Sequence, residues 1–385
     1  MANHAIVFGA SGVIGWSLVN QLLSPYPDAG TFSKVTAITN RPLNPYETHW
    51  PESSSERPDL QLVSGIDLRQ GGGTTLADTL KRTVKDVEIF TAVSEIREEV
   101  ATNRQMLKNV IAAHSLISPE LKFVAFPGGT RGYGIYVPGG TFTPPLHEEM
   151  VNDLPVNYAK TVVYTEYRMK IGFTPNGSQY SLSLHWAQFL SLWAYNHGIG
   201  PHRDGTNKAV EVPFPGSTAG ATSLFSPVSS KTIARFMIYA SLHPETCGNG
   251  QLFNIADNET PCKYGEIWPH LAEWFGLVGA RPAESPKSLE NTLKVGEVPE
   301  TTPSVMPGEY IAQHKGKFAE YGLPNAVTKG VRVGNRQLDS VGYSLTFDRE
   351  LSLKRLRATE FEGDIDPVQG WHESFEMFRK AGLIL

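Results

Sequence analysis

The chain has 385 residues, which is long for one domain and short for three, because domains usually span about 100–200 residues. Its formal net charge of -5 argues against a nucleic-acid partner, since phosphate binding favours a basic surface. Because it has two cysteines and no stretch near the roughly 18 apolar residues of a membrane span, we expect a cytoplasmic protein without a disulfide framework or a membrane partner.

The first half of the chain alternates short apolar runs with helical patterns. The runs are rich in β-branched residues and nearly unbroken, as expected for strands buried on both faces of a parallel sheet. The predicted strands are 4–10, 34–40, 60–67, 87–93, 121–128 and 180–186. Helices are predicted from Val13 to about Leu23 and over 95–116. This alternation predicts an α/β fold with a doubly wound, mostly parallel sheet.

The second half of the chain is less regular. Residues 252–257 (LFNIAD) are interpreted as one more strand that returns to the sheet, and 265–277 as an amphipathic helix. The stretch 278–305 is rich in Pro, Glu, Ser and Thr, which indicates a surface excursion, and 366–385 ends the chain with a helix.

Three glycines separate the first predicted strand from the first predicted helix. In GASGVIG, Gly9 permits a tight turn, Gly12 a close approach of backbone to pyrophosphate, and Gly15 close packing of helix on strand. The helix N-terminus offers free N–H groups to the phosphate. The predicted cofactor contacts are Gly9, Ser11, Gly12, Val13, Ile14 and Gly15. A plain strand–turn–helix is the alternative.

The ends of the second and third strands bear on which dinucleotide is bound. The second ends in Asn40 and Arg41 without an acidic residue, and an arginine there can hold a 2′-phosphate, so NADP(H) is favoured. A solvated surface arginine is the alternative. After the third strand, Asp67 and Leu68 stand where such folds often contact adenine.

These elements predict two domains. An NADP-binding Rossmann domain spans 1–186, and 226–258 returns to it. A smaller, mainly helical substrate-binding domain is formed by 187–225 and 259–385.

With these pieces in place, the chain resembles the progesterone 5β-reductase and iridoid synthase-like family of the short-chain dehydrogenase/reductase superfamily. The resemblance runs nearly end to end. It rests on GASGVIG, NRP, NRQMLKNVIAA, PPLHEEM with NDLP, FPGSTAGATSLFSPVSSKTIA, LFNIADNETPCKYGEIWPHLAEWFGL and the region from SVGYSLTF onward. It implies an extended Rossmann fold, NADPH, and 1,4-reduction of a conjugated enone or enal, with a role in specialised metabolism.

The resemblance also implies a catalytic tyrosine and lysine. Tyr164 matches the second tyrosine of a YYxxED-like pattern, although Tyr167 and Arg168 replace its acidic pair. Arg131 stands at the lysine of a QTGxK-like pattern, and arginine is planar and forked where lysine is compact. Arg168 is a second candidate cation, because it follows Tyr164 by one helical turn. An exposed helical arginine is the alternative for Arg168.

The family segment beside the nicotinamide is also altered. Trp186 and Ala187 replace the Arg and Pro of an RPxxIxG-like pattern. Trp186, Phe189 and Trp193 form an aromatic cluster, interpreted either as core packing or as the pocket wall for a flat, apolar substrate.

These departures leave the function open between two enzymes. One is an NADPH-dependent reductase of a small apolar metabolite. The other is a non-redox cyclase, isomerase or pericyclase that keeps NADP on the same scaffold. A regulatory nucleotide sensor is a third class. No metal-ligand spacing or G-x-S-x-G context is present in the sequence, so no metal is expected, and a homodimer is a possible assembly.

Overall fold

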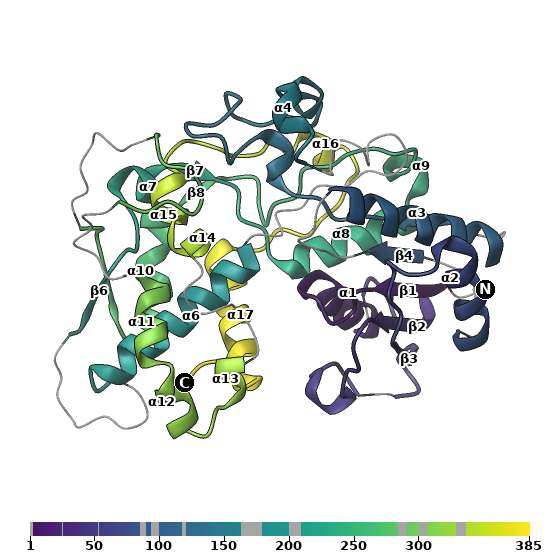
Figure 1. Cartoon of the computed structure of the whole chain (residues 1–385), viewed down its shortest axis with the longest axis horizontal. Coiled ribbons are helices and arrows are strands. Elements are labelled where there is room, and N and C mark those ends of the chain that lie inside the picture. The colour runs from purple at the N-terminus through teal and green to yellow at the C-terminus, as the bar shows by residue number, and fades with distance from the viewer. Residues whose placement is uncertain are drawn as a thin grey trace.

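A computed structural model describes residues 3–24, 26–52, 54–84, 90–93, 100–117, 121–162, 179–199, 209–283, 291–299, 306–328 and 336–385. The N-terminal third forms a lobe built on a sheet, and much of the C-terminal half forms a helical lobe beside it (Figure 1). The α4 and α16 segments, Val156–Ala159 and Lys354–Arg357, lie along one edge of this arrangement.

The sheet lobe contains five parallel strands in the order β3-β2-β1-β4-β5. Their bounds are β1 Asn3–Phe8, β2 Phe32–Thr39, β3 Asp59–Ser64, β4 Phe90–Val93 and β5 Phe123–Ala125. Ile6 lies opposite Thr36 of β2 and Thr91 of β4, so β1 is central. The doubly wound parallel sheet predicted from the alternating pattern is confirmed.

Strand β1 is apolar from Ala5 to Phe8 because both faces of the sheet are covered there. Ala5 and Val7 point to one core, and Ile6 and Phe8 to another; all four are fully buried. The first core includes helices α1 (Val13–Leu23) and α8 (Ser230–Leu242), and the second α2 (Gly72–Thr83) and α3 (Val100–Ile117). Burying each large side chain contributes about 1.5–3 kcal/mol, so β1 anchors the lobe.

Residues 252–257 do not form the predicted strand. Phe253 and Ile255 are fully buried, as the prediction required, but the polar groups between them bond elsewhere. The Asn254 backbone N–H donates to Glu148 Oε1 at 2.8 Å, and its Nδ2 donates to the Leu146 and Ser352 carbonyls. Because its backbone N–H is bound by a side chain, the segment is fixed as a buried connection rather than a strand.

Residues 180–186 also do not form a strand, because they belong to helix α6, Gln179–Asn196. Every residue from Leu182 to Leu192 is buried, so the helix lacks a polar face whose 3.6-residue period could reveal it. The predicted domain boundary at residue 186 lies inside this helix.

The helical lobe is made of many short elements around α6. Its helices are α7 Thr218–Thr222, α10 Tyr264–Trp274, α11 Pro307–His314, α12 Gly316–Glu320, α13 Asn325–Thr328, α14 Arg336–Asp339, α15 Val341–Ser344 and α17 Pro367–Lys380. The predicted helices near 265–277 and at the chain end correspond to α10 and α17 and are confirmed.

Small elements complete the described chain. Strand β6 (Glu211–Pro213) pairs with β9 (Val278–Ala280), and β7 (Leu224–Phe225) with β8 (Cys262–Lys263). The predicted excursion 278–305 therefore begins as a strand. Helix α9 spans Pro244–Cys247, and 3₁₀ turns span Pro45–Glu47, Thr130–Tyr133 and Glu148–Asp153.

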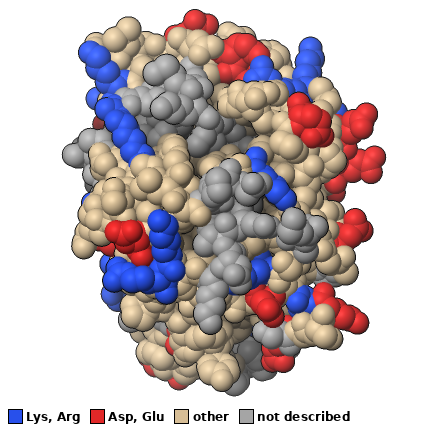
Figure 2. Space-filling view, turned by 90° about the vertical axis from the view of Figure 1, so that its right-hand side faces the viewer, with Lys and Arg blue, Asp and Glu red and all other residues tan. Residues whose placement is uncertain are grey.

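The outer face of the sheet lobe carries charges of both signs. Figure 2 shows basic and acidic side chains interspersed over this face among uncharged residues, so no large patch of one sign stands out. No helix among the described residues is long and apolar enough to cross a membrane.

Candidate active site

The glycine loop after β1 has the geometry that a bound phosphate requires. Gly9 has a φ of +70°, a conformation that side chains disfavour. A Cβ on Gly15 would lie 2.3 Å from the Gly9 carbonyl oxygen, so only glycine lets α1 approach this turn. Helix α1 has Gly12 as its N-cap, with no side-chain cap and no acidic residue in its first turn. Its positive N-terminal end is therefore free to meet an anion.

The carboxyl ends of β1, β2 and β3 are tied together beside this loop. Backbone bonds run from the Ala10 N–H to the Ile38 carbonyl (3.0 Å) and from Ile66 to Thr39 (3.2 Å). The Thr39 hydroxyl donates to the Arg41 carbonyl at 2.7 Å. Asn40 and Arg41 are exposed, so the Arg41 side chain projects to solvent from the same sheet edge as the glycine loop.

Asp67 lies in this edge too, but its carboxylate is already bonded. Arg69 donates to it from Nε (2.9 Å) and Nη2 (2.8 Å), and Gln70 from Nε2 at 3.3 Å. The hydrogen bond from Arg69 lowers the pKa of Asp67 to about 2. The neighbouring Leu68 carbonyl accepts from Asn109 Nδ2 at 2.8 Å. These hydrogen bonds fix Asp67 and Leu68 in place. An adenine ring could contact the two residues only in an orientation that leaves the bonds intact.

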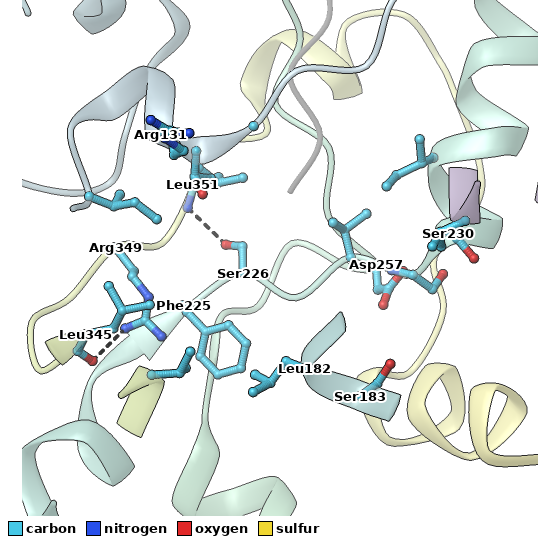
Figure 3. Close-up of a pocket in the computed structure, with 18 of the residues that line it drawn as sticks. Arg131, Leu182, Ser183, Phe225, Ser226, Ser230, Asp257, Leu345, Arg349 and Leu351 are labelled. Carbon is cyan, nitrogen blue, oxygen red and sulfur yellow. Dashed lines mark hydrogen bonds between the residues drawn. The ribbon is translucent and has the colours of Figure 1, made fainter. Parts of the chain in front are cut away.

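A cavity of about 350 Å³ lies between the glycine loop and the helical lobe. Its volume suits a small ligand. It is bounded by Val13 and Ile14 of α1, by 127–131 after β5, and by side chains of the helical lobe (Figure 3). The lobe's contribution includes Leu182, Ser183, Phe225, Tyr264, Val341, Leu345, Arg349 and Trp371. Among the described residues, no three His, Cys, Asp or Glu gather as metal ligands.

Arg131 is the cation of the sheet lobe at this cavity. Its Nη2 donates to the Thr161 carbonyl at 3.4 Å, and its guanidinium lies 5.3 Å from the centre of the Tyr136 ring. Thr161 stands three residues before Tyr164. Tyr164 and Arg168 themselves lie outside the described residues, so their predicted roles stay predictions.

Tyr158 is a residue that the sequence patterns did not single out. Burial raises the pKa of its hydroxyl, and the Arg131 guanidinium beside it acts in the opposite direction. It belongs to α4, outside the tyrosine motif. The bond that ties Arg131 to the α4 region is the one from its Nη2 to the Thr161 carbonyl, just after this helix.

The predicted aromatic wall is not part of this cavity. Trp186 is 1% exposed, stacks on Trp371 at 5.4 Å and meets Tyr264 edge-on. Phe189 and Trp193 pack with each other and with Tyr310 on another side of α6. Because the segment is a helix, its lining residues are Leu182 and Ser183, one turn before Trp186. Trp186 supports the cavity through Trp371, which does line it.

Two of the family-like motifs meet beside the cavity. Ser217 of FPGSTAG caps α7 by accepting from the Gly220 N–H at 3.0 Å. A Cβ on Gly220 would lie 1.9 Å from the carbonyl oxygen of Gly342 in SVGYS. The two backbones therefore touch, next to Val341, which lines the cavity. The glycines of the two motifs were the sequence signal for this contact.

Asp257, which lines the cavity, ties three segments together. Its Oδ1 accepts from the Ser229 N–H (2.8 Å) and the Thr232 hydroxyl (2.6 Å) at the start of α8, and its carbonyl accepts from the Ile365 N–H. Burial raises its pKa from 3.8 to about 6.

The raised pKa of Asp257 predicts a pH-dependent stability. The folded state holds a proton that the unfolded chain releases, so this contribution is complete below about pH 4 and is lost as the pH rises through 6. Two pKa units correspond to about 3 kcal/mol. Urea unfolding between these pH values should show the slope in the wild type and lose it in Asp257→Asn. The exposed Asp78→Asn is the control, and an unchanged slope in Asp257→Asn contradicts the assignment.

Comparison with known proteins agrees with this geometry. Residues 5–297 match the family described as a PRISE-like Rossmann-fold domain. The short chain dehydrogenase sirR of Leptosphaeria maculans is 28% identical, over 99% of this chain and 97% of that protein. The 3-oxo-Delta(4,5)-steroid 5-beta-reductase of Arabidopsis thaliana is 25% identical, over 71% of this chain and 69% of that protein.

A solved structure extends the likeness of fold. The UDP-glucose 4-epimerase of Thermus thermophilus aligns with a TM-score of 0.52 at 12% identity, over 98% of this chain and 99% of that one. At this identity the match bears on the fold alone, and it agrees with the parallel sheet and helical lobe. The chain belongs to the PRISE-like Rossmann-fold family and is an enzyme of the short-chain dehydrogenase/reductase type.

Proposed function

We propose that this enzyme uses NADPH to reduce the conjugated double bond of an enone or enal in a small, largely apolar metabolite. The observation that carries the proposal is the position of the cavity. Val13 and Ile14 lie between Gly12 and Gly15 of the glycine motif and line the cavity, so a dinucleotide held there would extend into the space where a substrate fits. The resemblance of the chain to a steroid 5-beta-reductase supports the same chemistry.

The residues present fit a dinucleotide phosphate. Gly15 keeps the turn clear of a side chain, and the first turn of α1 holds no acidic residue that would repel an anion. Arg41 is exposed at the end of β2 and has no ion pair among the described residues. A 2′-phosphate would give its guanidinium a partner, which supports NADP over NAD.

When bound, NADPH would supply the hydride for the β-carbon of the enone. Negative charge would then develop on the substrate oxygen, and a proton from water would complete the reduction at the α-carbon once the enolate leaves the site. We assign to Tyr164 the hydrogen bond that stabilises this oxygen. Arg131 carries a positive charge at the cavity, and its bond to the Thr161 carbonyl ties it to the segment that leads to Tyr164. The apolar side chains of the helical lobe exclude water from the reacting carbon.

A non-redox cyclase or isomerase is the second candidate, and Arg131 is the observation that favours it. Among the described residues, no lysine lines the cavity, so the cation there is a guanidinium. A guanidinium is a good partner for a carbonyl oxygen but cannot replace the compact ammonium in every contact. In that reaction Tyr164 would donate to a substrate carbonyl without hydride transfer.

Isotope transfer separates the two candidates. The purified enzyme is incubated with NADPH deuterated at the transferred position and with a panel of apolar enones and enals. We expect deuterium at the β-carbon of at least one product and a matching loss of NADPH absorbance. Rearranged product without deuterium would support the non-redox enzyme and exclude the reductase for that substrate.

The Arg131→Met variant tests the assigned cation. We expect kcat to fall about tenfold to a hundredfold, because charge on the substrate oxygen develops in the transition state, while KM changes less. Initial rates with the best enone measure both constants. Arg57→Met is the control, since Arg57 also donates to a backbone carbonyl, that of Glu52, but does not line the cavity. A change confined to KM would remove Arg131 from the catalytic step.

The Arg41→Ala variant tests cofactor preference. Loss of a charge-assisted hydrogen bond costs about 1.5–3 kcal/mol, so affinity for NADP should fall about tenfold to a hundredfold. Affinity for NAD, which lacks the 2′-phosphate, should change less than threefold. Titration calorimetry with both nucleotides measures the two constants, and an equal loss for both would show that Arg41 does not contact the phosphate.

A further inference from the structure

Arg349 is a buried arginine on the helical-lobe side of the cavity. It is 7% exposed, and Figure 3 shows its guanidinium among the lining residues, beside Phe225 and Leu345. One nitrogen, Nη1, makes three hydrogen bonds: to Ser223 Oγ (3.0 Å), to the Phe347 carbonyl (3.2 Å) and to the Leu345 carbonyl (3.3 Å). All three acceptors are uncharged.

The other terminal nitrogen of Arg349, Nη2, is buried and makes no hydrogen bond of ordinary length and angle with the described residues, although the guanidinium interacts electrostatically with the Tyr264 hydroxyl. Within the same residues no carboxylate lies within 4 Å of the guanidinium. The rings of Phe225 and Tyr264 lie 5.1 and 5.8 Å from it, and the neighbouring Asp348 is exposed and accepts from the Leu224 N–H. Burying an uncompensated charge costs several kcal/mol, so this position favours an anion.

A second buried donor without a partner lines the same cavity. The Trp371 side chain of α17 is 3% exposed, and its Nε1 has no acceptor among the described residues. Its ring is held by stacking on Trp186, with 18° between the planes. Trp186 in turn contacts Tyr264, the ring that lies beside Arg349. Two buried N–H donors without partners thus belong to residues that line the same cavity, and leaving buried donors unpaired is costly.

We propose that this end of the cavity binds a carboxylate of the substrate, with Arg349 Nη2 donating to the carboxylate and Trp371 Nε1 to an oxygen of the same ligand. The inference rests on the proposed function, because it uses the same cavity. The substrate would then be an apolar molecule with its conjugated carbonyl toward Arg131 and its acidic group toward Arg349. A neutral ester or alcohol leaves the buried charge uncompensated, so the acid is preferred.

The test measures binding without turnover. Titration calorimetry on the NADP-saturated enzyme compares octanoate with methyl octanoate, which differ in the acidic group. We expect octanoate to bind at least tenfold more tightly. Arg349→Met should remove this preference, Arg349→Lys should keep part of it, and Trp371→Phe should weaken octanoate several-fold.

The control is Arg379→Met. Arg379 lies on α17 above the Trp274 ring at 3.9 Å, but it is 49% exposed and does not line the cavity. It should leave the preference unchanged. Thermal unfolding identifies any variant that fails to fold; should Arg349→Met fail, Arg349→Lys and Trp371→Phe carry the test.

Two outcomes overturn the inference: equal binding of acid and ester by the wild type, or an unchanged preference in folded Arg349→Met. Failure of the proposed function is a separate result. If no enone is reduced, but the wild type binds octanoate more tightly than methyl octanoate and Arg349→Met does not, the carboxylate site is supported and the reductase activity is not.

Discussion

Replacing Gly15 by alanine is expected to abolish NADP binding and to lower the free energy of unfolding by about 1–3 kcal/mol. The added Cβ would lie 2.3 Å from the Gly9 carbonyl oxygen and 3.0 Å from the Cα of Ala10. Both are backbone atoms, so no side-chain rotation relieves the clash. Helix α1 must move away from the turn, and the phosphate-binding N–H groups move with it. Titration with NADP and urea unfolding measure the two effects.

Gly316→Ala is the matched control. Gly316 begins α12, has nothing within 4 Å of the position that a Cβ would take, and is far along the chain from the glycine loop. Alanine favours a helix over glycine by up to about 1 kcal/mol, so this variant should be as stable as the wild type or slightly more so. The higher helix propensity of alanine also acts at position 15, but the clash with the Gly9 carbonyl oxygen should outweigh it there. Normal NADP affinity in Gly15→Ala would remove the glycine loop from the proposed site.

The sheet could be predicted from the sequence because its evidence is local. The central strand β1 is a short run with two buried faces, as Ile6 and Val7 show, and the loop after it carries the glycines that the turn requires. The predicted start and end of α1, Val13 and Leu23, match the structure because the glycine loop precedes the helix and the chain turns after it.

Helix α6 was mispredicted because burial on all sides removes the helical period. The alternation in YSLSLHW is typical of a half-buried strand. Two signals favoured a helix: the absence of any Val, Ile or Thr from 179 to 196, and a run of 18 residues without Gly or Pro. The error at 252–257 has another cause, since the Asn254 N–H bonds to the distant Glu148.

The two ends of the candidate site also differ in how well the sequence alone reveals them. The glycine loop and Arg41 each belong to a short motif of neighbouring residues, so the sequence could suggest a bound dinucleotide. Arg349 and Trp371 come from segments far along the chain, and no motif joins them to Arg131. What marks them is burial without a partner, and burial is a property of the folded chain. The sequence therefore pointed to a cofactor but not to the group that the helical lobe could recognise.

The second large effect is expected at the buried pair His185 and Asp339. His185 Nε2 lies 2.9 Å from Asp339 Oδ1, and the same oxygen accepts from the Gly308 N–H at 2.7 Å. The histidine is 1% exposed and the aspartate 4%. One carboxylate thus joins α6, α11 and α14, and two of these helices carry the cavity residues Ser183 and Leu338.

Asp339→Ala should lower the free energy of unfolding by about 3 kcal/mol, because it leaves two buried groups without their partner. Asp364→Ala is the control: Asp364 pairs with Arg357 at 2.6 Å but is 57% exposed, so its loss should cost under about 1 kcal/mol. Urea unfolding measures both. A double-mutant cycle with His185→Ala should give a coupling of about 0.5–3 kcal/mol.

Asp339→Ala should also change the cavity, because the His185–Asp339 pair supports two helices that line it. Loosening α6 and α14 displaces Ser183 and Leu338 without touching the glycine loop, so KM for the enone should rise while NADP affinity stays near that of the wild type. If Asp339→Ala and Asp364→Ala cost the same, the buried pair is not what holds the helical lobe. If NADP affinity falls together with the enone, the two lobes depend on each other more closely than their separate cores indicate.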